Sequence, residues 1–270
     1  MGLFVCAVVP ICAEGHLLHR WEKQFFPTQL QGTLFGHDII LRTMSKRNLH
    51  PNHTAVPKNF CRLPNGYGVV KIGVSGTADM GHLGLAAFDV AKEIGREIAR
   101  HGAIITTGAT TGFPMYAAMG AKDECGFSVG ISPAATEREH MEVYKLPKDF
   151  MDVVIYTGFG YSGRDILFVR SSDAMIVGPG RVGTINEFSV AFEDHRPTGV
   201  LRGPWDTDEL IELMINAAHR PNPNIFFESD PKALVERLIE MVIKNKTEND
   251  LVYNNHDGYS GTGKSADLIL

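Results

Sequence analysis

VVKIGVSGTADMGHLGLAAFDVAKEIGREIARHGAIITTG, residues 69–108, is the stretch that decides the fold. Both ends of this stretch are short runs that are apolar on every side, as expected of strands in a parallel sheet with helices on both faces. Between them, residues 83–101 repeat apolar side chains at helical spacing, and Gly102 supplies a stop. A strand, a helix and a second strand predict a right-handed crossover between two parallel strands.

The same alternation continues to residue 243. Further strands are expected at FSVGIS, VVIYTG, AMIVGPG, TGVLRG and NIFFES, and further helices at residues 115–124, 165–170, 184–195, 208–218 and 231–243. We therefore expect an α/β fold in which residues 69–243 form one Rossmann-like, nucleotide-binding domain with a doubly wound, mostly parallel sheet of about seven strands. Ligands of such sheets bind outside the carboxyl ends of the strands.

The segments outside this domain give weaker signals. Residues 1–68 are expected to be a poorly defined extension, and residues 1–43 to lie outside the native core, because Met44 opens a polar stretch typical of a protein start. Residues 244–270 are expected to be a flexible tail. This tail contains GYSGTGKS, residues 258–265, which has the spacing of a phosphate-binding P-loop but lacks the strand and the long helix that such a loop requires.

Composition limits the partners. The chain has 270 residues and a net charge of -5, which disfavours binding to nucleic acid or to an anionic membrane. The apolar run at residues 3–13 is too short to cross a bilayer. The four cysteines, Cys6, Cys12, Cys61 and Cys125, form no C-x-x-C pair, so we expect a reducing, cytoplasmic setting, and we identify no metal site.

Glycine-rich loops follow the first two strands. In GVSGTADMGHLG, Ser75 and Gly76 are candidates to contact a phosphate, although a turn that needs glycine explains this loop equally well. In TGATTGFPMYAA, Gly108, Thr111 and Gly112 lead into a helix whose N-terminal dipole favours an anion. A tight turn packed on the sheet is the alternative for this second loop.

The loops after the fourth and fifth strands add charge. Arg164 stands at the expected start of a helix, where a cation is unfavourable unless it faces an anion. Arg170 lies on another face of that helix and is expected to be structural. In PGRVGTINE, residues 179–187, candidates for phosphate binding are Gly180, Arg181, Gly183 and Thr184, and Glu187 follows one turn into the helix. Thr184 and Glu187 also have the spacing of a capping box, which is the alternative interpretation.

Together these loops resemble the Lonely Guy (LOG) family and its Rossmann-like superfamily. PGRVGTINE matches the family pattern P-G-G-x-G-T-x-x-E at every defined position except Arg181, and Arg164 stands nine residues before Asp173, as the family Arg does. The resemblance covers residues 69–243. It implies hydrolysis of the N-glycosidic bond of a nucleoside 5'-monophosphate, giving a free base and ribose 5-phosphate.

The resemblance also implies roles for single residues. Glu187 and Arg164 would act at the ribose and the base, and the glycine loops would hold the 5'-phosphate. The family needs neither a metal nor an organic cofactor, and a homodimer is expected. The sequence departs from the pattern of the cytokinin-activating members at two places. Arg181 stands in place of a glycine, and the residues around Arg164 are YSGRDI. The alternative is therefore a carrier or sensor of a phosphate-bearing ligand, similar to molybdenum-cofactor carrier proteins.

Overall fold

The structure, a computed structural model, describes residue 61, residues 68–79 and residues 85–254, with side chains as far as residue 247. Strands and helices alternate along it. Their bounds are β1 Lys71–Ser75, α3 Leu85–Arg100, β2 Ile104–Thr107, α4 Phe113–Asp123, β3 Ser128–Ser132, η1 Glu139–Val143, β4 Val153–Tyr156, α5 Gly160–Ser171, β5 Ala174–Val177, α6 Val182–Glu193, β6 Thr198–Leu201, α7 Thr207–Ala218, β7 Ile225–Glu228 and α8 Pro231–Asn254.

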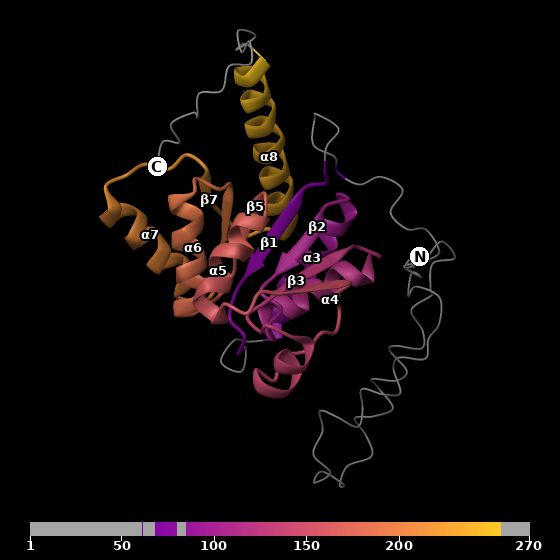
Figure 1. Cartoon of the computed structure of the whole chain (residues 1–270). Coiled ribbons are helices and arrows are strands. Elements are labelled where there is room, and N and C mark those ends of the chain that lie inside the picture. The colour runs from indigo at the N-terminus through magenta and orange to yellow at the C-terminus, as the bar shows by residue number, and fades with distance from the viewer. Residues whose placement is uncertain (1–60, 62–67, 80–84, 255–270) are drawn as a thin grey trace, which may run out of the picture. The chain divides into compact units, whose positions relative to one another are not determined.

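The seven strands form one sheet in which every pair is parallel, with the order β4-β3-β2-β1-β5-β6-β7 (Figure 1). The first strand of the sheet, β1, is central; the chain then runs outward to β4 and returns to β5 on the other side of β1. In register, Val74 of β1 lies level with Thr107 of β2 and Ile176 of β5, so these strands end together. The predicted doubly wound α/β fold is confirmed, and its topological switch point lies between β1 and β5.

Helices cover both faces of the sheet. On one face α3, α4 and α8 pack over a large core that includes Ile72, Ile94, Ile105 and Leu234. On the other face α5, α6 and α7 pack over two smaller cores, with Phe168 and Phe188 among their largest buried side chains. Burial on both sides explains why the strands are apolar throughout.

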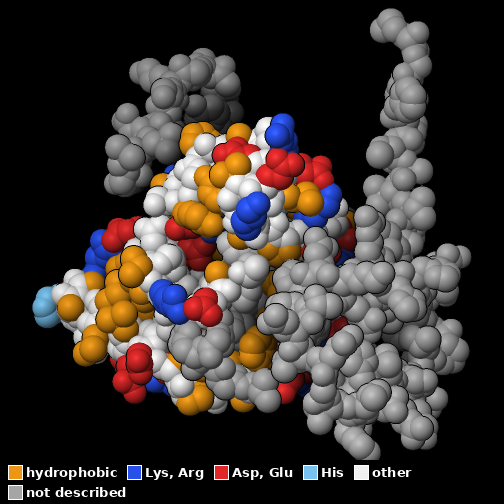
Figure 2. Space-filling model, turned by 90° about the horizontal axis from the view of Figure 1, so that it is seen from below, with side chains coloured by type: hydrophobic (Ala, Val, Ile, Leu, Met, Phe, Trp, Pro, Cys, Tyr) orange, Lys and Arg blue, Asp and Glu red, His pale blue; other side chains and the backbone are white. Residues whose placement is uncertain are grey.

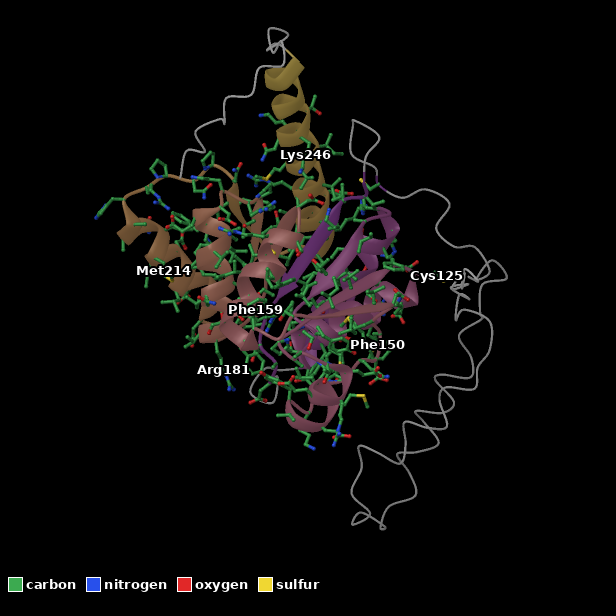
Figure 3. The ribbon with its side chains drawn as sticks, viewed as in Figure 1. Cys125, Phe150, Phe159, Arg181, Met214 and Lys246 are labelled. Atoms are coloured by element: carbon green, nitrogen blue, oxygen red, sulfur yellow. The ribbon has the colours of Figure 1, made fainter. Side chains whose placement is uncertain are left out.

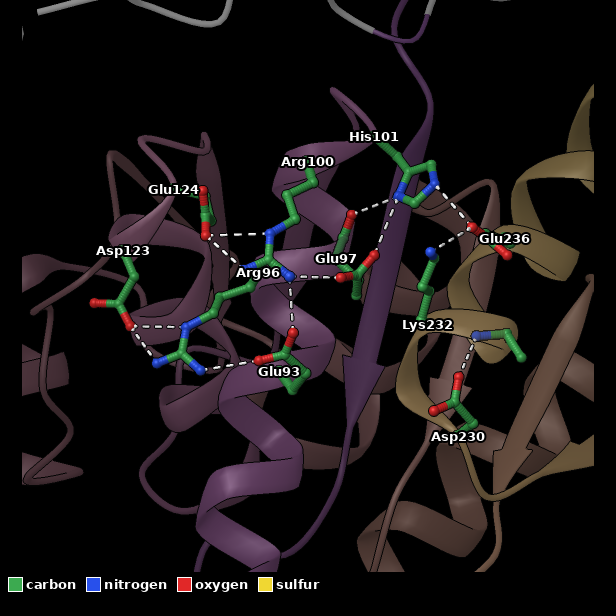
Figure 4. A network of polar contacts seen from close by, with 11 residues as sticks. Glu93, Arg96, Glu97, Arg100, His101, Asp123, Glu124, Asp230, Lys232 and Glu236 are labelled. Carbon is green, nitrogen blue, oxygen red and sulfur yellow. Dashed lines mark hydrogen bonds and ion pairs between the residues drawn. The ribbon is translucent and has the colours of Figure 1, made fainter. Parts of the chain in front are cut away.

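An ion-pair network, partly or fully exposed except for Glu97, ties α3 to its neighbours (Figure 4). Arg96 bridges Glu93, at 3.0 Å, and Asp123 of α4, at 2.8 Å. Arg100 pairs with Glu97 at 2.6 Å and with Glu124, just after α4, at 2.8 Å. Exposed pairs contribute about 0–1 kcal/mol each, so the buried apolar contacts between α3 and α4 are the stronger link.

Several predicted helix boundaries are wrong. α4 and α6 each begin two residues earlier than expected, at Phe113 and Val182, and α5 begins at Gly160 instead of Asp165. The glycines and the β-branched residue in these first turns have low helix propensity, and tertiary contacts override that preference. One such contact is the hydrogen bond that the Gly160 amide donates to the Pro133 carbonyl, at 3.1 Å.

Two further segments differ from the sequence expectation. The tail was expected to begin at residue 244, but α8 continues to Asn254, because a helix that has already nucleated extends at little cost. The short π-helix η1 was not predicted. It is held by His140, which is buried between the Ser132 hydroxyl, at 2.8 Å, and the Pro147 carbonyl, at 2.9 Å. GYSGTGKS and residues 1–60 lie outside the described residues.

None of the helices that the structure describes combines the length and the apolar character needed to span a bilayer.

Candidate functional site

A cavity of about 270 Å³ opens at the switch point. The loops after β1 and β5 are joined beside it by two hydrogen bonds: the Thr77 amide donates to the Pro179 carbonyl at 2.7 Å, and the Gly178 amide to the Ser75 carbonyl at 2.9 Å. The residues that line it are Val74, Gly76, Thr77, Ala78, Asp79, Gly108, Thr110, Pro114, Tyr161, Arg164, Asp165, Arg181, Gly183, Thr184 and Glu187. Ligands of doubly wound sheets bind at this place.

The figures show the surroundings of this end of the sheet. Figure 3 places Arg181 in the lower left of the molecule, Phe159 above it near the middle, and Lys246 of α8 near the upper end. Figure 2, seen from below, shows Lys and Arg side chains, Asp and Glu side chains and hydrophobic side chains close together on this face. The face therefore offers apolar contacts beside charges of both signs.

Glu187 lines the cavity and is 6% exposed. Its Oε1 receives a hydrogen bond from Nη1 of Arg164 at 3.0 Å, and its Oε2 receives one from the Ser75 hydroxyl. Helix α6 has no side-chain hydrogen bond at its N-cap, so the capping-box interpretation of Thr184 and Glu187 is wrong. The carboxylate is held by β1 and α5, not by its own helix.

Burial raises the pKa of Glu187 to about 7, because the surrounding protein solvates the charged carboxylate poorly. The positive charge of Arg164 and the Ser75 hydrogen bond oppose this rise, and the neighbouring Asp165 adds to it. A carboxyl group with this pKa is present in both protonation states near neutral pH, so it can donate or accept a proton there.

Arg164 is 5% exposed and lies in the second turn of α5, one turn further into the helix than expected. The sequence argument that it must face an anion holds, since Glu187 receives its hydrogen bond. Gly108 of the β2–α4 loop packs directly against the guanidinium, so a methyl group at that position would overlap Arg164. As expected, Arg170 is exposed and structural, and it pairs with Asp194 at 2.9 Å.

The first turn of α6 forms the wall next to Glu187. Arg181 is the N-cap residue, and both Gly183 and Thr184 line the cavity. A methyl group at Gly183 would meet no atom within 4 Å, so the backbone there faces open space. The first amides of a helix have no partner inside the helix, which makes this turn a potential anion site.

The first turn of α4 is arranged differently. The Phe113 amide donates to the Thr77 carbonyl at 2.9 Å, and the Thr111 hydroxyl donates to the Ala78 carbonyl at 2.9 Å. Gly112, with φ of 74°, packs its backbone against these same two residues. This turn is therefore closed against the loop that follows β1.

The structure brings seven of the eleven predicted site residues to the cavity wall: Gly76, Gly108, Arg164, Arg181, Gly183, Thr184 and Glu187. Four others lie behind it: Ser75, Thr111, Gly112 and Gly180. Ser75 supports Glu187, and the Gly180 amide donates to the Thr207 hydroxyl at 2.8 Å. Direct contact of any of the eleven with a ligand stays a prediction.

Three charged or aromatic residues of the wall were missed by the sequence argument. Asp165 follows Arg164 and is 4% exposed, Tyr161 is 49% exposed, and Asp79 pairs with Arg181 at 2.9 Å across the cavity mouth. A signal for Asp165 was available, because an Arg-Asp pair beside a glycine-rich loop is an unusual place for two charges. The sequence gives no such signal for Tyr161 or Asp79, since exposed residues of these types are common near loops.

Comparison with known proteins adds the family. The model of the SLOG cluster4 family matches residues 69–235. The chain belongs to this family. A protein of uncharacterised function from Archaeoglobus fulgidus is 31% identical over 136 residues, which is 50% of this chain and 82% of that one. The SLOG match confirms the LOG-like resemblance drawn from PGRVGTINE and Arg164.

Two solved structures share the SLOG fold of this chain. The molybdenum cofactor binding protein of Rippkaea orientalis is 25% identical with a TM-score of 0.52, covering 64% of this chain and 96% of that one. The molybdenum cofactor carrier protein of Chlamydomonas reinhardtii is 26% identical with a TM-score of 0.50, covering 63% and 96%. Within the described residues, no group of three or more His, Cys, Asp or Glu side chains is arranged to hold a metal ion.

Proposed function

We propose that the cavity binds a small phosphorylated, nucleotide-like ligand, with its phosphate at the first turn of α6. Three features support this placement: the helix dipole, the amides of the first turn and the open space in front of Gly183. Thr184 is buried beside this turn and adds a hydroxyl group. Arg181 adds a positive charge at the same place.

The rest of the ligand then has a defined direction. From the start of α6, Glu187 lies about one turn along the helix, so the sugar of a nucleotide would reach its carboxylate. Tyr161 stands on the α5 side of the cavity, and its ring is 6.0 Å from the Arg164 guanidinium carbon. A half-exposed aromatic ring in a cavity wall offers a stacking surface to a planar base.

We further propose that the protein hydrolyses the N-glycosidic bond of a nucleoside 5'-monophosphate. The observation that carries this proposal is the buried Glu187 carboxylate, held by Arg164 and Ser75 close to the first turn of α6. When the bond from C1' to the base breaks, positive charge develops on the ribose ring. A fixed carboxylate stabilises that charge more than it stabilises the neutral ground state.

A second candidate is a carrier that binds the ligand without cleaving it. Both oxygens of Glu187 already accept hydrogen bonds from protein groups, which fits a structural role. The two solved relatives at 25% and 26% identity are named for binding or carrying the molybdenum cofactor. For this candidate, the ligand would be a phosphate-bearing pterin in the same cavity.

One experiment separates the two candidates. The full chain is incubated with a panel of nucleoside 5'-monophosphates, and free base and ribose 5-phosphate are quantified by chromatography. The hydrolase predicts release from at least one substrate, with a loss of at least about a hundredfold in Glu187→Gln, because the stabilising charge is gone. The matched control is Glu193→Gln, an exposed carboxylate in the same helix that pairs with Arg220.

The same preparation tests the carrier. Ligand retained by the native protein is released by denaturation and identified by mass spectrometry. No turnover across the panel, together with a retained pterin, would reject the hydrolase in favour of the carrier.

We also propose that the protein is cytoplasmic and forms a homodimer. The exposed apolar side chains Val153 and Ile155 on the edge strand β4 support the homodimer, and light scattering measures its stoichiometry.

A further inference from the structure

The wall of the cavity carries one more buried carboxylate than the proposed reaction uses. Arg164, Asp165 and Glu187 are 5%, 4% and 6% exposed, so three ionisable side chains are buried side by side. One guanidinium faces two carboxyl groups, which leaves one excess negative charge if both are ionised. An uncompensated buried charge is costly, and a shared proton removes it.

Asp165 is held in this cluster by contacts on two sides. Its Oδ2 accepts a hydrogen bond from the Asn186 side chain at 2.7 Å, and its Oδ1 lies 3.4 Å from Nε of Arg164. That Nε makes no hydrogen bond to any of the described residues, so the pair with Asp165 is looser than the 3.0 Å hydrogen bond to Glu187. Arg164 therefore neutralises Glu187 better than it neutralises Asp165.

The charges that face Glu187 come from few elements. From α5 they are Arg164 and Asp165, and β1 contributes only the neutral Ser75 hydroxyl. Among the described residues, the other charged members of the cavity wall are Asp79 and Arg181, which are exposed and pair with each other. Solvent screens that pair, so Asp165 is the negative charge with the strongest effect on Glu187.

We propose that Asp165 is a positioning residue that shares a single proton with Glu187, and that this carboxyl pair delivers the proton that the departing base takes up. The proposal rests on the proposed hydrolase function and assigns the proton donor within it. Two carboxyl groups close together cannot both ionise easily, so the first proton is held at neutral pH.

The proton and the electrons balance in this reaction. The bond between C1' and the base nitrogen breaks, its electron pair stays on the nitrogen, and the nitrogen takes the proton from the Glu187 carboxyl. Loss of this proton leaves Glu187 as the charged carboxylate that stabilises the positive ribose. A water molecule then adds to C1' and returns a proton to the carboxylate pair. One water is consumed, and the products are the free base and ribose 5-phosphate.

The test titrates Glu187 in the full chain without a ligand. Side-chain carboxyl carbons of glutamate are labelled with ¹³C, and the Glu187 signal is assigned by its loss in Glu187→Gln. In Asp165→Asn the titration midpoint of Glu187 should fall by about one pH unit or more, because the adjacent negative charge is removed. Asp165→Ser gives a second variant if the Asn variant does not fold.

The matched control is Asp79→Asn, which removes a carboxylate from the same cavity at an exposed position. Its effect on the midpoint should be clearly smaller. An unchanged midpoint in both Asp165 variants, or an equal shift in Asp79→Asn, would overturn the proposal.

Turnover then provides a separate readout. If a nucleoside monophosphate is hydrolysed, the alkaline limb of the pH–rate profile should move to lower pH in Asp165→Asn, by the same shift as the midpoint. If no substrate is hydrolysed but the midpoint shifts, the shared proton stands and the hydrolase fails. The two failures are therefore distinguishable.

Discussion

Two strand–helix junctions at the carboxyl edge of the sheet have the same glycine-rich composition and opposite structures. At the β2–α4 junction, the first helical amide donates to the Thr77 carbonyl, and the Thr111 hydroxyl donates to the Ala78 carbonyl. At the β5–α6 junction, a methyl group at Gly183 would meet no atom within 4 Å, so the first helical turn is open. Both junctions line the cavity, the first through Gly108 and Thr110 and the second through Gly183 and Thr184. We call the first the closed junction and the second the open junction.

The difference shows what makes a helix start available to an anion. The residue after Phe113 in the closed junction is a proline, which has no amide to donate, and the amide before it is already used. In the open junction the first amides of the helix remain available to a ligand, and a buried carboxylate lies about one turn further along the helix. Glycine content alone does not distinguish these two cases, but the partners of the backbone amides do.

The largest effect on stability is expected at the closed junction. In Gly112→Ala the new methyl group would overlap the Thr77 carbonyl at a φ of 74°, so the free energy of unfolding should fall by at least about 2 kcal/mol. Urea denaturation measures it. The matched control is Gly160→Ala, which has a φ of 64° but no atom within 4 Å of the new methyl group, and should lose about 1 kcal/mol. Equal losses would contradict the closed packing.

An effect of similar size, visible only as a pH dependence, is expected at the open junction. Because burial raises the pKa of Glu187 to about 7 from 4.5, the folded protein binds this proton more tightly than the unfolded chain does. The resulting stability is complete below about pH 4.5 and is lost as the pH rises through 7. Gln cannot titrate, so Glu187→Gln should gain about 2–3 kcal/mol relative to the wild type between pH 5 and pH 8.

The measurement is urea denaturation of both proteins at four pH values in this range. Glu193→Gln serves as the control, because its carboxylate is exposed and should give a nearly constant difference. A constant difference for Glu187→Gln as well would show that the open junction carries no buried titrating charge. The closed junction, residues 107–113, contains no ionisable side chain and predicts no such effect.

Much of this comparison could be predicted from the sequence. Apolar runs at regular spacing indicate the parallel sheet, because both of its faces are buried, and the position of ligands then follows from the topology. PGRVGTINE indicates the open junction and Glu187, because its residue types have defined roles in binding an anion. Arg164 was found by an argument that placed it at the start of a helix; α5 begins one turn earlier, but the guanidinium does face a carboxylate, Glu187.

The rest depended on long-range partners. Phe113 donates to a carbonyl that lies 36 residues earlier in the chain, and no local pattern reveals that contact. The helix starts at Gly160 and Val182 were missed because glycine and β-branched residues weaken local propensity. Asp165 was missed because its role arises from the proximity of Glu187, which is 22 residues away in sequence.

The smallest effect on stability, and the sharpest test of the open junction, is Gly183→Ala. The added methyl group meets no protein atom within 4 Å, and alanine is the better helix former, so stability should change by less than about 1 kcal/mol and in the favourable direction. The same methyl group would occupy the space in front of the first amides of α6. Affinity for the tightest-binding nucleoside 5'-monophosphate of the panel, measured by calorimetry, should therefore fall at least about tenfold.

The control, Val182→Ala, changes the adjacent residue, which is 83% exposed and outside the cavity wall. It should leave affinity within about twofold. Unchanged affinity in Gly183→Ala would mean that the phosphate lies elsewhere, and that the two junctions differ in packing but not in function.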